Sequence, residues 1–416
     1  MMLRNYLEEQ SSIPYETLNV MIGAITYGGR VTDKMDKICN VKILSRYIVP
    51  DIMEDDYKLS DSGFYYAPKE GSLQAVQEYI ENLPDVDKPE AYGLHANAAT
   101  SYFFNETKEI LNTLTTMEGS GSGAGSGDSD TARVLKLIES VLGRMPPAMI
   151  IEDAHPDTVR KIADGSMNSL GVFVIQEATR FNKLRSVVVK TLTNLKKAIQ
   201  GLVVMSLSLE DMFVRLCFNR VPKTWEDAAY PSLKPLSPWI EDFFMRLEDI
   251  GGWLSSGPPN AFWVSGFFFP QGFVTAVLQT YSRATKTAVD TLTLDTLITS
   301  KFTKGEIEKP PEHGVYVYGL YIQGARFDVT KMKMSESKPG VLFELVPVIH
   351  FNPLTFEQFD LGTRYECPLY KTSRRAGTLS TTGHSTNFVR ALAIETDVNP
   401  DHWIRRGVAL LCMLDD

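Results

Sequence analysis

The chain has 416 residues, of which 44% are hydrophobic and 22% charged, as is ordinary for a globular protein. Its net charge of -9 argues against nucleic-acid binding, because neutralising phosphates needs a basic face. The four cysteines form no C-x-x-C pair, which excludes zinc-ribbon spacing and gives no disulfide framework of the small secreted kind. We therefore expect two or three domains, reduced thiols, no nucleic-acid partner and no metal site.

Neither a leader nor a membrane span is expected from the sequence. The first residues contain no apolar core of the kind found in signal peptides. The most apolar stretch, 261–278, is interrupted by Gly266, Pro270 and Gly272 and is shorter than a clean 20-residue span. We interpret it as a buried aromatic segment, so no membrane partner is predicted.

Residues 1–88 show the punctuation of short helices. Pro14 suits a first helical turn, Gly28 and Gly29 end that helix, and Thr32 or Asp33 can cap the next one. Apolar residues recur at helical spacing within 37–47 and again within 73–80. The pattern predicts an all-helical unit that is too small for a nucleotide-binding α/β core.

A second helical region is expected from 89 to 309. One helix runs through Met117, and the Gly/Ser-rich segment 119–130 after it is typical of a flexible linker. The composition fits an engineered junction as well as a natural disordered loop. Another helix is expected from Asp130 to Leu142, and Pro146 and Pro147 break it.

The longest regular element is expected over about 170–218. Its apolar residues step by three or four along one face: Phe181, Leu184, Val188, Leu192, Leu195, Ile199 and Leu202. Such a stripe can be a coiled-coil seam, and the lysines on the other faces can form a basic docking surface. We favour a core helix with a solvated face, since the stripe covers too few heptads to require a partner chain.

Further helices are expected over 225–300, where prolines separate segments rich in tryptophan. From Gly314 the period changes to that of strands, which are expected at 315–322, 341–351, 365–371, 385–396 and 403–414. No helical pattern of 10–15 residues separates them, so a doubly wound parallel sheet is excluded here. Residues 310–416 are therefore predicted to form an antiparallel barrel or sandwich.

Chemistry-bearing motifs are weak throughout the chain. The segment 23–30 lacks the lysine and the Ser/Thr of a phosphate-binding loop. The segment 383–387 approaches a nucleophile elbow but ends in Asn387 and lies between predicted strands. The six histidines show no metal-type spacing. We expect no catalytic, cofactor-binding or metal-binding residue, and a tight β-connection at Ser385.

Several long segments resemble dynein heavy chains. The strongest is a Y-G-G-R-V-T-D core, formed here by Tyr27, Gly28, Gly29, Arg30, Val31, Thr32 and Asp33. Ala24 and Thr26 depart from the residues usual before that core. Other similar segments are 92–98, 176–182, 197–206, 229–236, 265–271, 314–320, 324–328, 365–372 and 377–388. Together they cover almost the whole chain.

The resemblance implies the C-terminal region of a heavy chain. Residues 1–88 would be the helical lid of the sixth AAA+ module, and Tyr27, Gly28, Gly29, Arg30 and Asp33 its structural motif. Residues 89–309 would be the helical part of the C-terminal domain, with the loop 119–130, and 310–416 a six-stranded antiparallel β-barrel. The fold class is then α+β.

The resemblance also implies a function. The parent would be a minus-end-directed microtubule motor that uses ATP and Mg, with no cofactor in this region. The expected partners are the AAA+ ring of the same heavy chain, dynein complex subunits and, through the missing stalk, microtubules. The ending 407–416 looks axonemal, which places the protein in the cytoskeleton of a cilium or flagellum. Two alternatives remain open: a stand-alone barrel that binds a protein or small ligand, and a hydrolase.

Overall fold

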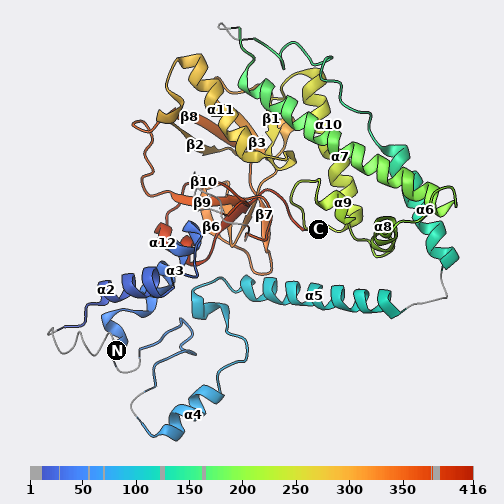
Figure 1. Cartoon of the computed structure of the whole chain (residues 1–416). Helices are drawn as coiled ribbons and strands as arrows, with labels where there is room; N and C mark the ends of the chain where they lie inside the picture. Colours follow the sequence, from blue (N-terminus) through green and yellow to red (C-terminus); the bar gives the residue numbers. More distant parts are fainter. Residues whose placement is uncertain are drawn as a thin grey trace.

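The computed structural model describes residues 12–27, 29–54, 57–68, 71–121, 127–161, 165–375, 377 and 385–415. The fold is α+β, as expected: helices dominate the first two thirds of the chain and strands the last third. In Figure 1, the first helices, drawn in blue, lie at one end of the molecule, next to the strand-rich part, and the green and yellow-green helices lie on the other side of that part. Within the described residues, no helix is both long and apolar enough to span a membrane.

The N-terminal part, residues 12–96, consists of short helices whose starts follow local capping rules. Asp33 and Ser72 cap α3 and α4 by accepting backbone N–H groups. The elements are α2 (Tyr15–Val20), the π-helical turn η1 (Met21–Thr26), α3 (Lys34–Tyr47), η2 (Pro50–Met53), α4 (Leu73–Glu81) and η3 (Pro89–Tyr92). Few of their side chains are fully buried, so this part relies on contacts with the rest of the chain.

Two helices follow on either side of the Gly/Ser-rich segment. Helix α5 spans Asn97–Gly121 and α6 spans Gly127–Arg144. The flexible linker expected at 119–130 is wrong at both ends, because residues 119–121 belong to α5 and residues 127–130 to α6, and its centre, 122–126, lies outside the described residues.

The long helix α7 (Ser169–Ile199) passes through the main core. Phe181, Leu184, Leu192 and Leu195 are fully buried, which confirms that the apolar stripe is a core face. The prediction of one continuous helix over 170–218 is wrong, because α7 ends at Ile199 and α8 (Leu207–Cys217) is a separate helix. Gly201 has a φ of +73°, the left-handed conformation that closes a helix C-terminus and that the apolar periodicity does not reveal.

An aromatic core packs against α7. It is supplied by α9 (Lys223–Glu226), α10 (Leu236–Ser256) and α11 (Pro270–Thr285). The rings of Trp225 and Trp239 stack at 5.5 Å, and Phe267 contacts Phe173 and Phe273 at 5.0 and 4.9 Å between centroids. The segment 261–278 is largely buried within this core, as expected.

The helical region expected to reach residue 309 contains two strands. Strand β1 (Ala261–Trp263) pairs in parallel with β3 (Val315–Tyr318), and β2 (Leu292–Ile298) pairs antiparallel with β8 (Ile349–Thr355). The order of this sheet is β1-β3-β8-β2. Its strands thus come from both sides of Lys309, and one apolar core cluster includes residues from α7, α10, β3 and β8.

The remaining strands form two further sheets. Their spans are β4 (Tyr321–Gln323), β5 (Ala325–Asp328), β6 (Lys333–Glu336), β7 (Phe343–Leu345), β9 (Tyr365–Tyr370), β10 (Phe388–Ile394) and β11 (Ala409–Leu411). One sheet has the order β10-β9-β11-β4-β7, and β5 pairs with β6 alone. The strand expected at 403–414 begins instead as helix α12 (Pro400–Arg405), capped by Asn399.

The six-stranded antiparallel barrel expected for 310–416 is not found in the part of the chain that the structure describes. Closure requires every strand to be paired on both sides, whereas these strands form separate sheets with edges. Two pairings, β1 with β3 and β11 with β9, are parallel. Several strands have only three residues, and β2 enters from outside the expected barrel. Periodicity along a strand does not specify which strand lies beside it.

Candidate functional site

The Tyr27–Asp33 turn joins η1 to α3. The backbone N–H groups of Arg30 and Val31 both donate to the Tyr27 carbonyl at 2.9 Å, which closes the turn. The side chains of Tyr27 and Arg30 are exposed, Gly29 lies in open space, and Gly28 lies outside the described residues. Among the described residues of the motif predicted from sequence, Asp33 is the one that the fold buries.

The Asp33 carboxylate serves two elements at once. Its Oδ1 accepts the N–H groups of Met35 at 2.8 Å and Asp36 at 3.3 Å, which caps α3. Its Oδ2 accepts the N–H of Ser385 at 2.7 Å, from a residue that shortly precedes β10. Both oxygens therefore receive backbone donors, one set within the N-terminal part and one from the strand-rich part. Hydrogen bonds to a charged acceptor are stronger than neutral ones.

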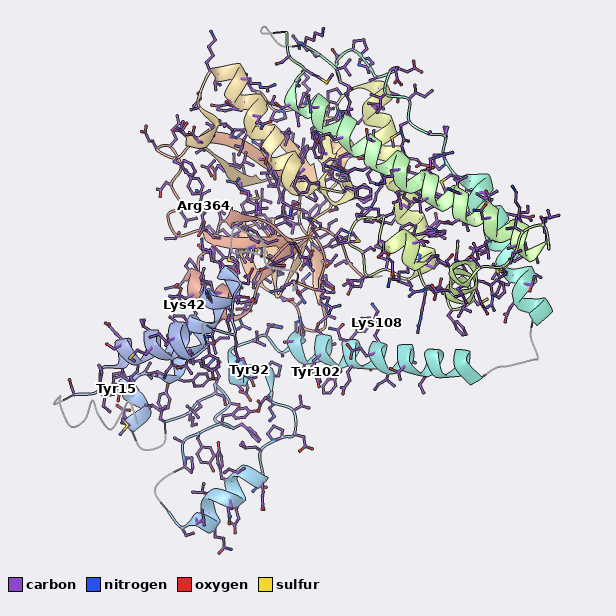
Figure 2. The ribbon with its side chains drawn as sticks, viewed as in Figure 1. Tyr15, Lys42, Tyr92, Tyr102, Lys108 and Arg364 are labelled. Atoms are coloured by element: carbon purple, nitrogen blue, oxygen red, sulfur yellow. The ribbon has the colours of Figure 1, made fainter. Side chains whose placement is uncertain are left out.

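Helices α3 and α12 make a second contact between the same two parts. Lys42 Nζ lies 2.7 Å from Asp401 Oδ2, and the Cys39 thiol donates to the Ile404 carbonyl at 3.4 Å. Figure 2 shows Lys42 on α3, near the strand-rich part. The ion pair is more than a third exposed, so we expect it to orient the helices more than to stabilise them.

Asn97, at the start of α5, makes a third contact. Its side-chain nitrogen donates to Ser337 Oγ at 3.2 Å and to the carbonyls of Lys338 and Val341 at 2.8 and 2.9 Å. Its oxygen accepts the N–H of Gly340 at 2.8 Å. The side chain is 7% exposed and its amide is bonded at both ends. It clamps the turn between β6 and β7.

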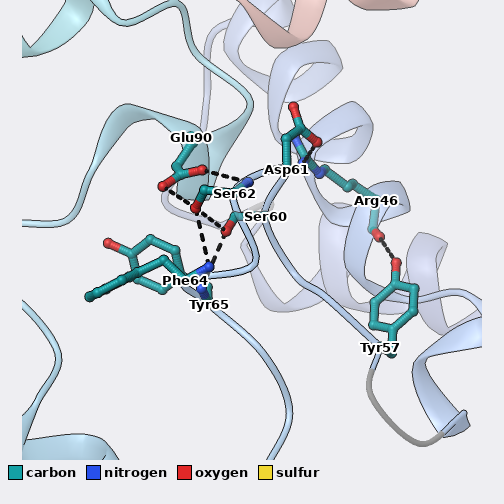
Figure 3. Close-up of polar contacts among 8 residues, drawn as sticks. All are labelled: Arg46, Tyr57, Ser60, Asp61, Ser62, Phe64, Tyr65 and Glu90. Atoms are coloured by element: carbon teal, nitrogen blue, oxygen red, sulfur yellow. Dashed lines mark hydrogen bonds and ion pairs between the residues drawn. The ribbon is translucent and has the colours of Figure 1, made fainter.

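The segment leading to Asn97 is held by polar contacts within the N-terminal part, shown in Figure 3. The Glu90 carboxylate in η3 accepts from Ser62 N at 3.2 Å and Ser62 Oγ at 2.8 Å. Arg46 at the end of α3 pairs with Asp61 at 2.8 Å. These contacts tie the loop 57–66 to both α3 and η3. The N-terminal part therefore presents Asp33 and Lys42, and leads into Asn97, from one connected framework.

A cavity of about 380 Å³ lies between α3 and β9, next to these contacts. Burial, followed by the charge of Asp33, raises the pKa of Asp36 above its ordinary value. Burial, followed by the charge of Asp36, likewise raises the pKa of the Cys39 thiol, so this thiol is not activated as a nucleophile. The positive charge of Arg375 acts against both increases in pKa. Its guanidinium already donates hydrogen bonds to the Gly407 carbonyl and to the Gln323 side chain. The described residues here contain no nucleophile–base pair.

Two family profiles cover nearly the whole chain. One is described as the AAA lid domain of the dynein heavy chain and matches residues 1–98. The other is described as the C-terminal domain of the dynein heavy chain and matches residues 104–412. The chain belongs to the dynein heavy chain family.

Similar proteins carry the same family name. The chain is 40% identical to dynein axonemal heavy chain 6 of Homo sapiens, 41% to dynein axonemal heavy chain 1 of Rattus norvegicus and 41% to dynein axonemal heavy chain 12 of Mus musculus. These matches include 100%, 99% and 100% of this chain, but 10%, 9% and 13% of the relatives. The chain therefore spans about a tenth of the length of the curated relatives it matches, as a lid and C-terminal region.

The three contacts described above lie between the two matched regions of this dynein chain. Asp33, Lys42 and Asn97 belong to the lid match, whereas Ser385 and Asp401 belong to the C-terminal domain match. We call these contacts the lid junction. Asp33 belongs to the motif predicted from sequence, whereas local patterns do not single out Lys42, Asn97 or Asp401. The sequence does point to Asn97 in another way, since this residue lies in the segment 92–98 that resembles the family.

Ser385 lies in the segment that weakly resembles a nucleophile elbow. In the structure its contacts are those of a structural residue of the lid junction. Its hydroxyl donates to the Arg375 carbonyl at 3.0 Å and accepts from Asn387 N at 3.1 Å. Its neighbours Gly383 and His384 lie outside the described residues. Among described residues, no group of three or more His, Cys, Asp or Glu side chains is placed to hold a metal ion.

Proposed function

We propose that this chain is the non-catalytic C-terminal region of an axonemal dynein heavy chain, within a minus-end-directed microtubule motor of cilia or flagella. The names of the relatives support the axonemal assignment, since the matches quoted above are to axonemal heavy chains. The location would be the axonemal cytoskeleton. The remaining AAA+ ring of the same heavy chain and other dynein subunits would be its partners, and microtubules would be reached only through the stalk.

The proposed role is mechanical. The lid of an AAA+ module moves with its ring, and the lid junction gives such a movement a direct route into the C-terminal domain. The observation that carries this proposal is the Asp33 carboxylate, which caps α3 with one oxygen and binds Ser385 with the other. A shift of α3 therefore moves the acceptor of the Ser385 N–H. The C-terminal domain would modulate motor output in this way, because coupling requires contacts that differ between states.

The proposal includes no cofactor in this region and leaves ATP and Mg²⁺ to the parent motor. The segment 23–30 supports this, since Gly29 and Arg30 stand where a phosphate-binding loop has its lysine and its Ser/Thr. In addition, Arg30 is exposed and does not line the cavity between α3 and β9. Isothermal titration of this chain with MgATP tests the point. Saturable micromolar binding would overturn the non-catalytic assignment.

The mechanical role is tested in the complete heavy chain with the substitution Asp33→Ala. We expect altered microtubule gliding velocity with basal ATP turnover retained, because the ATP sites lie outside this region. Asp85→Ala is the matched control, since Asp85 is exposed and makes no hydrogen bond or ion pair among the described residues. Equal velocities for the two variants and the unmodified motor would show that the lid junction does not transmit movement.

A further inference from the structure

The connection between α7 and α8 exposes apolar side chains on a rigid support. Residues 200–208 are all exposed, and we call them the α7–α8 tip. Its apolar side chains are all well exposed: Leu202 by 72%, Val203 by 45%, Val204 by 87%, Met205 by 41% and Leu207 by 86%. The Leu202 N–H donates to the Lys197 carbonyl at 2.9 Å, and Ser206 Oγ caps α8 by accepting from Leu209 N. Both ends of the tip are thus held by helix caps.

A row of free lysines leads along α7 to this tip. Lys183, Lys190 and Lys197 are exposed and seven residues apart, so they share one face of the helix over roughly 21 Å. Among the described residues they make no ion pair, whereas the neighbouring Lys196 pairs with Glu139 at 2.8 Å. We call these three residues the lysine row.

The local charge is opposite to that of the whole chain. Residues 178–224 contain nine basic and two acidic residues, a net charge of +7, in a chain whose net charge is -9. Of these basic residues, Arg180, Lys196 and Arg215 already pair with carboxylates of the same chain, so the lysine row is the part of this charge that faces outward to attract further carboxylates. A groove with an apolar floor and an acidic rim would therefore be complementary to the α7–α8 tip and the lysine row.

We propose that the α7–α8 tip and the lysine row dock into such a groove on another part of the same dynein heavy chain. This inference rests on the proposed function, which places the region against the ring of its own chain. It adds the surface that makes the contact and the chemistry of its partner: an apolar pocket for Leu202, Val204 and Leu207, with carboxylates along one side.

The size of the surface favours a partner in the same chain. The exposed apolar area of the tip is roughly 400 Å² at the usual area per aliphatic side chain. A stable complex between separate proteins buries about 800 Å² on each partner. A tethered partner has an effective concentration in the millimolar range, so a contact of this size stays occupied within one chain.

The geometry disfavours an anionic membrane as the partner. If the tip entered a bilayer, Lys183 would lie about 20 Å behind it, beyond the Debye length of about 8 Å. If α7 lay flat instead, the residues between the lysines would face the lipid, and Ser186 and Asn194 are polar.

Site-specific cross-linking in the complete heavy chain tests the inference. The photoreactive residue p-benzoylphenylalanine is placed at Val204, and cross-linked peptides are mapped by mass spectrometry. Phe356 is the control position, because it is also apolar and 60% exposed but directly follows β8. Figure 1 shows β8 and α8 on different sides of the molecule. We expect position 204 to cross-link within the chain to an Asp/Glu-rich surface outside this region, and position 356 not to do so.

A second variant, with Lys183→Glu, Lys190→Glu and Lys197→Glu, is expected to lower the cross-link yield several-fold. Raising the salt concentration should lower it as well, since exposed charges are screened. A cross-link from position 204 to a separate subunit, to a second copy or to phosphatidylserine vesicles would overturn the inference, as would no cross-link. The two proposals fail separately: if Asp33→Ala leaves the gliding velocity unchanged while position 204 still cross-links within the chain, the proposed function alone is contradicted.

Discussion

The buried carboxylate of Glu177 in α7 accepts the backbone N–H of Phe268 at 2.6 Å and pairs with Arg180 at 2.6 Å. Phe268 lies just before α11 in the aromatic core, so the Glu177 side chain joins α7 to the segment that leads into α11. The side chain is 0% exposed, and burial raises the pKa of Glu177 above 4.5, although the Phe268 N–H and Arg180 oppose that shift.

Replacing Glu177 by Gln should therefore change how stability depends on pH. A carboxyl with a raised pKa in the folded state holds its proton to higher pH than in the unfolded state. Its contribution to stability is full below pH 4.5 and is lost as the pH rises through the folded pKa. We expect the melting temperature of Glu177→Gln, relative to the unmodified chain, to rise with pH above 4.5. Thermal melts followed by circular dichroism from pH 4 to 8 measure this.

The control is Glu241→Gln, because the hydrogen bond from Arg144 lowers the pKa of Glu241 and reverses the sign. The relative melting temperature of that variant should fall as the pH rises to about 4.5 and stay level above it, because the Glu241 carboxylate is fully formed in both states at higher pH. Parallel curves for the two variants would show that burial does not govern the titration of Glu177.

Asn97→Ala should weaken the lid junction. The substitution removes the hydrogen bonds to Ser337, Lys338, Val341 and Gly340. The Val341 carbonyl keeps the Ser337 hydroxyl and the Lys338 carbonyl keeps the Val341 N–H, so the Gly340 N–H is the backbone group that loses its partner. We expect a loss of about 2–3 kcal/mol in the free energy of unfolding, measured by urea titration. Asn105→Ala, on the exposed surface of α5, should change it by less than about 0.5 kcal/mol. Equal effects would mean that Asn97 is not a clamp.

Gly314→Ala should be among the most harmful small changes in the chain. Gly314 has a φ of +74°, and an added Cβ would meet the Phe351 carbonyl oxygen at 1.9 Å, next to the β3–β8 pairing. We expect a loss of more than about 3 kcal/mol. Gly340 has a similar φ of +77° with open space around it, so Gly340→Ala isolates the backbone cost of about 1–2 kcal/mol. Urea titrations that give equal losses would refute the predicted clash.

Removing residues 310–416 should unfold the helical region as well. Strand β2 pairs over its whole length with β8, and the core of α7 and α10 continues into β3. Residues 1–309 alone would expose this apolar surface and the unpaired edge of β2. We expect no cooperative thermal transition by circular dichroism and rapid digestion by a protease. A cooperative melt close to that of the full chain would show that residues 1–309 fold independently and that a domain boundary lies at Lys309.

Local sequence signals are sufficient where the determining interactions are close in the chain. The caps of α3 and α4, the buried face of α7 and the burial of 261–278 all follow from residue type and spacing within a few turns. Gly201 shows the limit of that reasoning, since the apolar stripe continues to Leu202 while the helix stops at Ile199.

The lid junction does not follow from local patterns. Asp33 stands out within a motif, but its bond to Ser385 joins residues 352 positions apart. The Lys42–Asp401 and Asn97–Gly340 contacts likewise depend on how the two parts pack. A polar residue on a helix face has the same local pattern whether it meets solvent or a distant carbonyl.

The sequence by itself determined the α+β class, the positions of most helices and the resemblance to dynein heavy chains, because capping, periodicity and long ordered motifs are properties of neighbouring residues. Only the tertiary structure decided that β1 and β2 join strands beyond Lys309, that the sheets stay separate and that Asp33 reaches Ser385. Strand partners and long-range hydrogen bonds are selected by the packing of the whole core, to which each segment contributes one face.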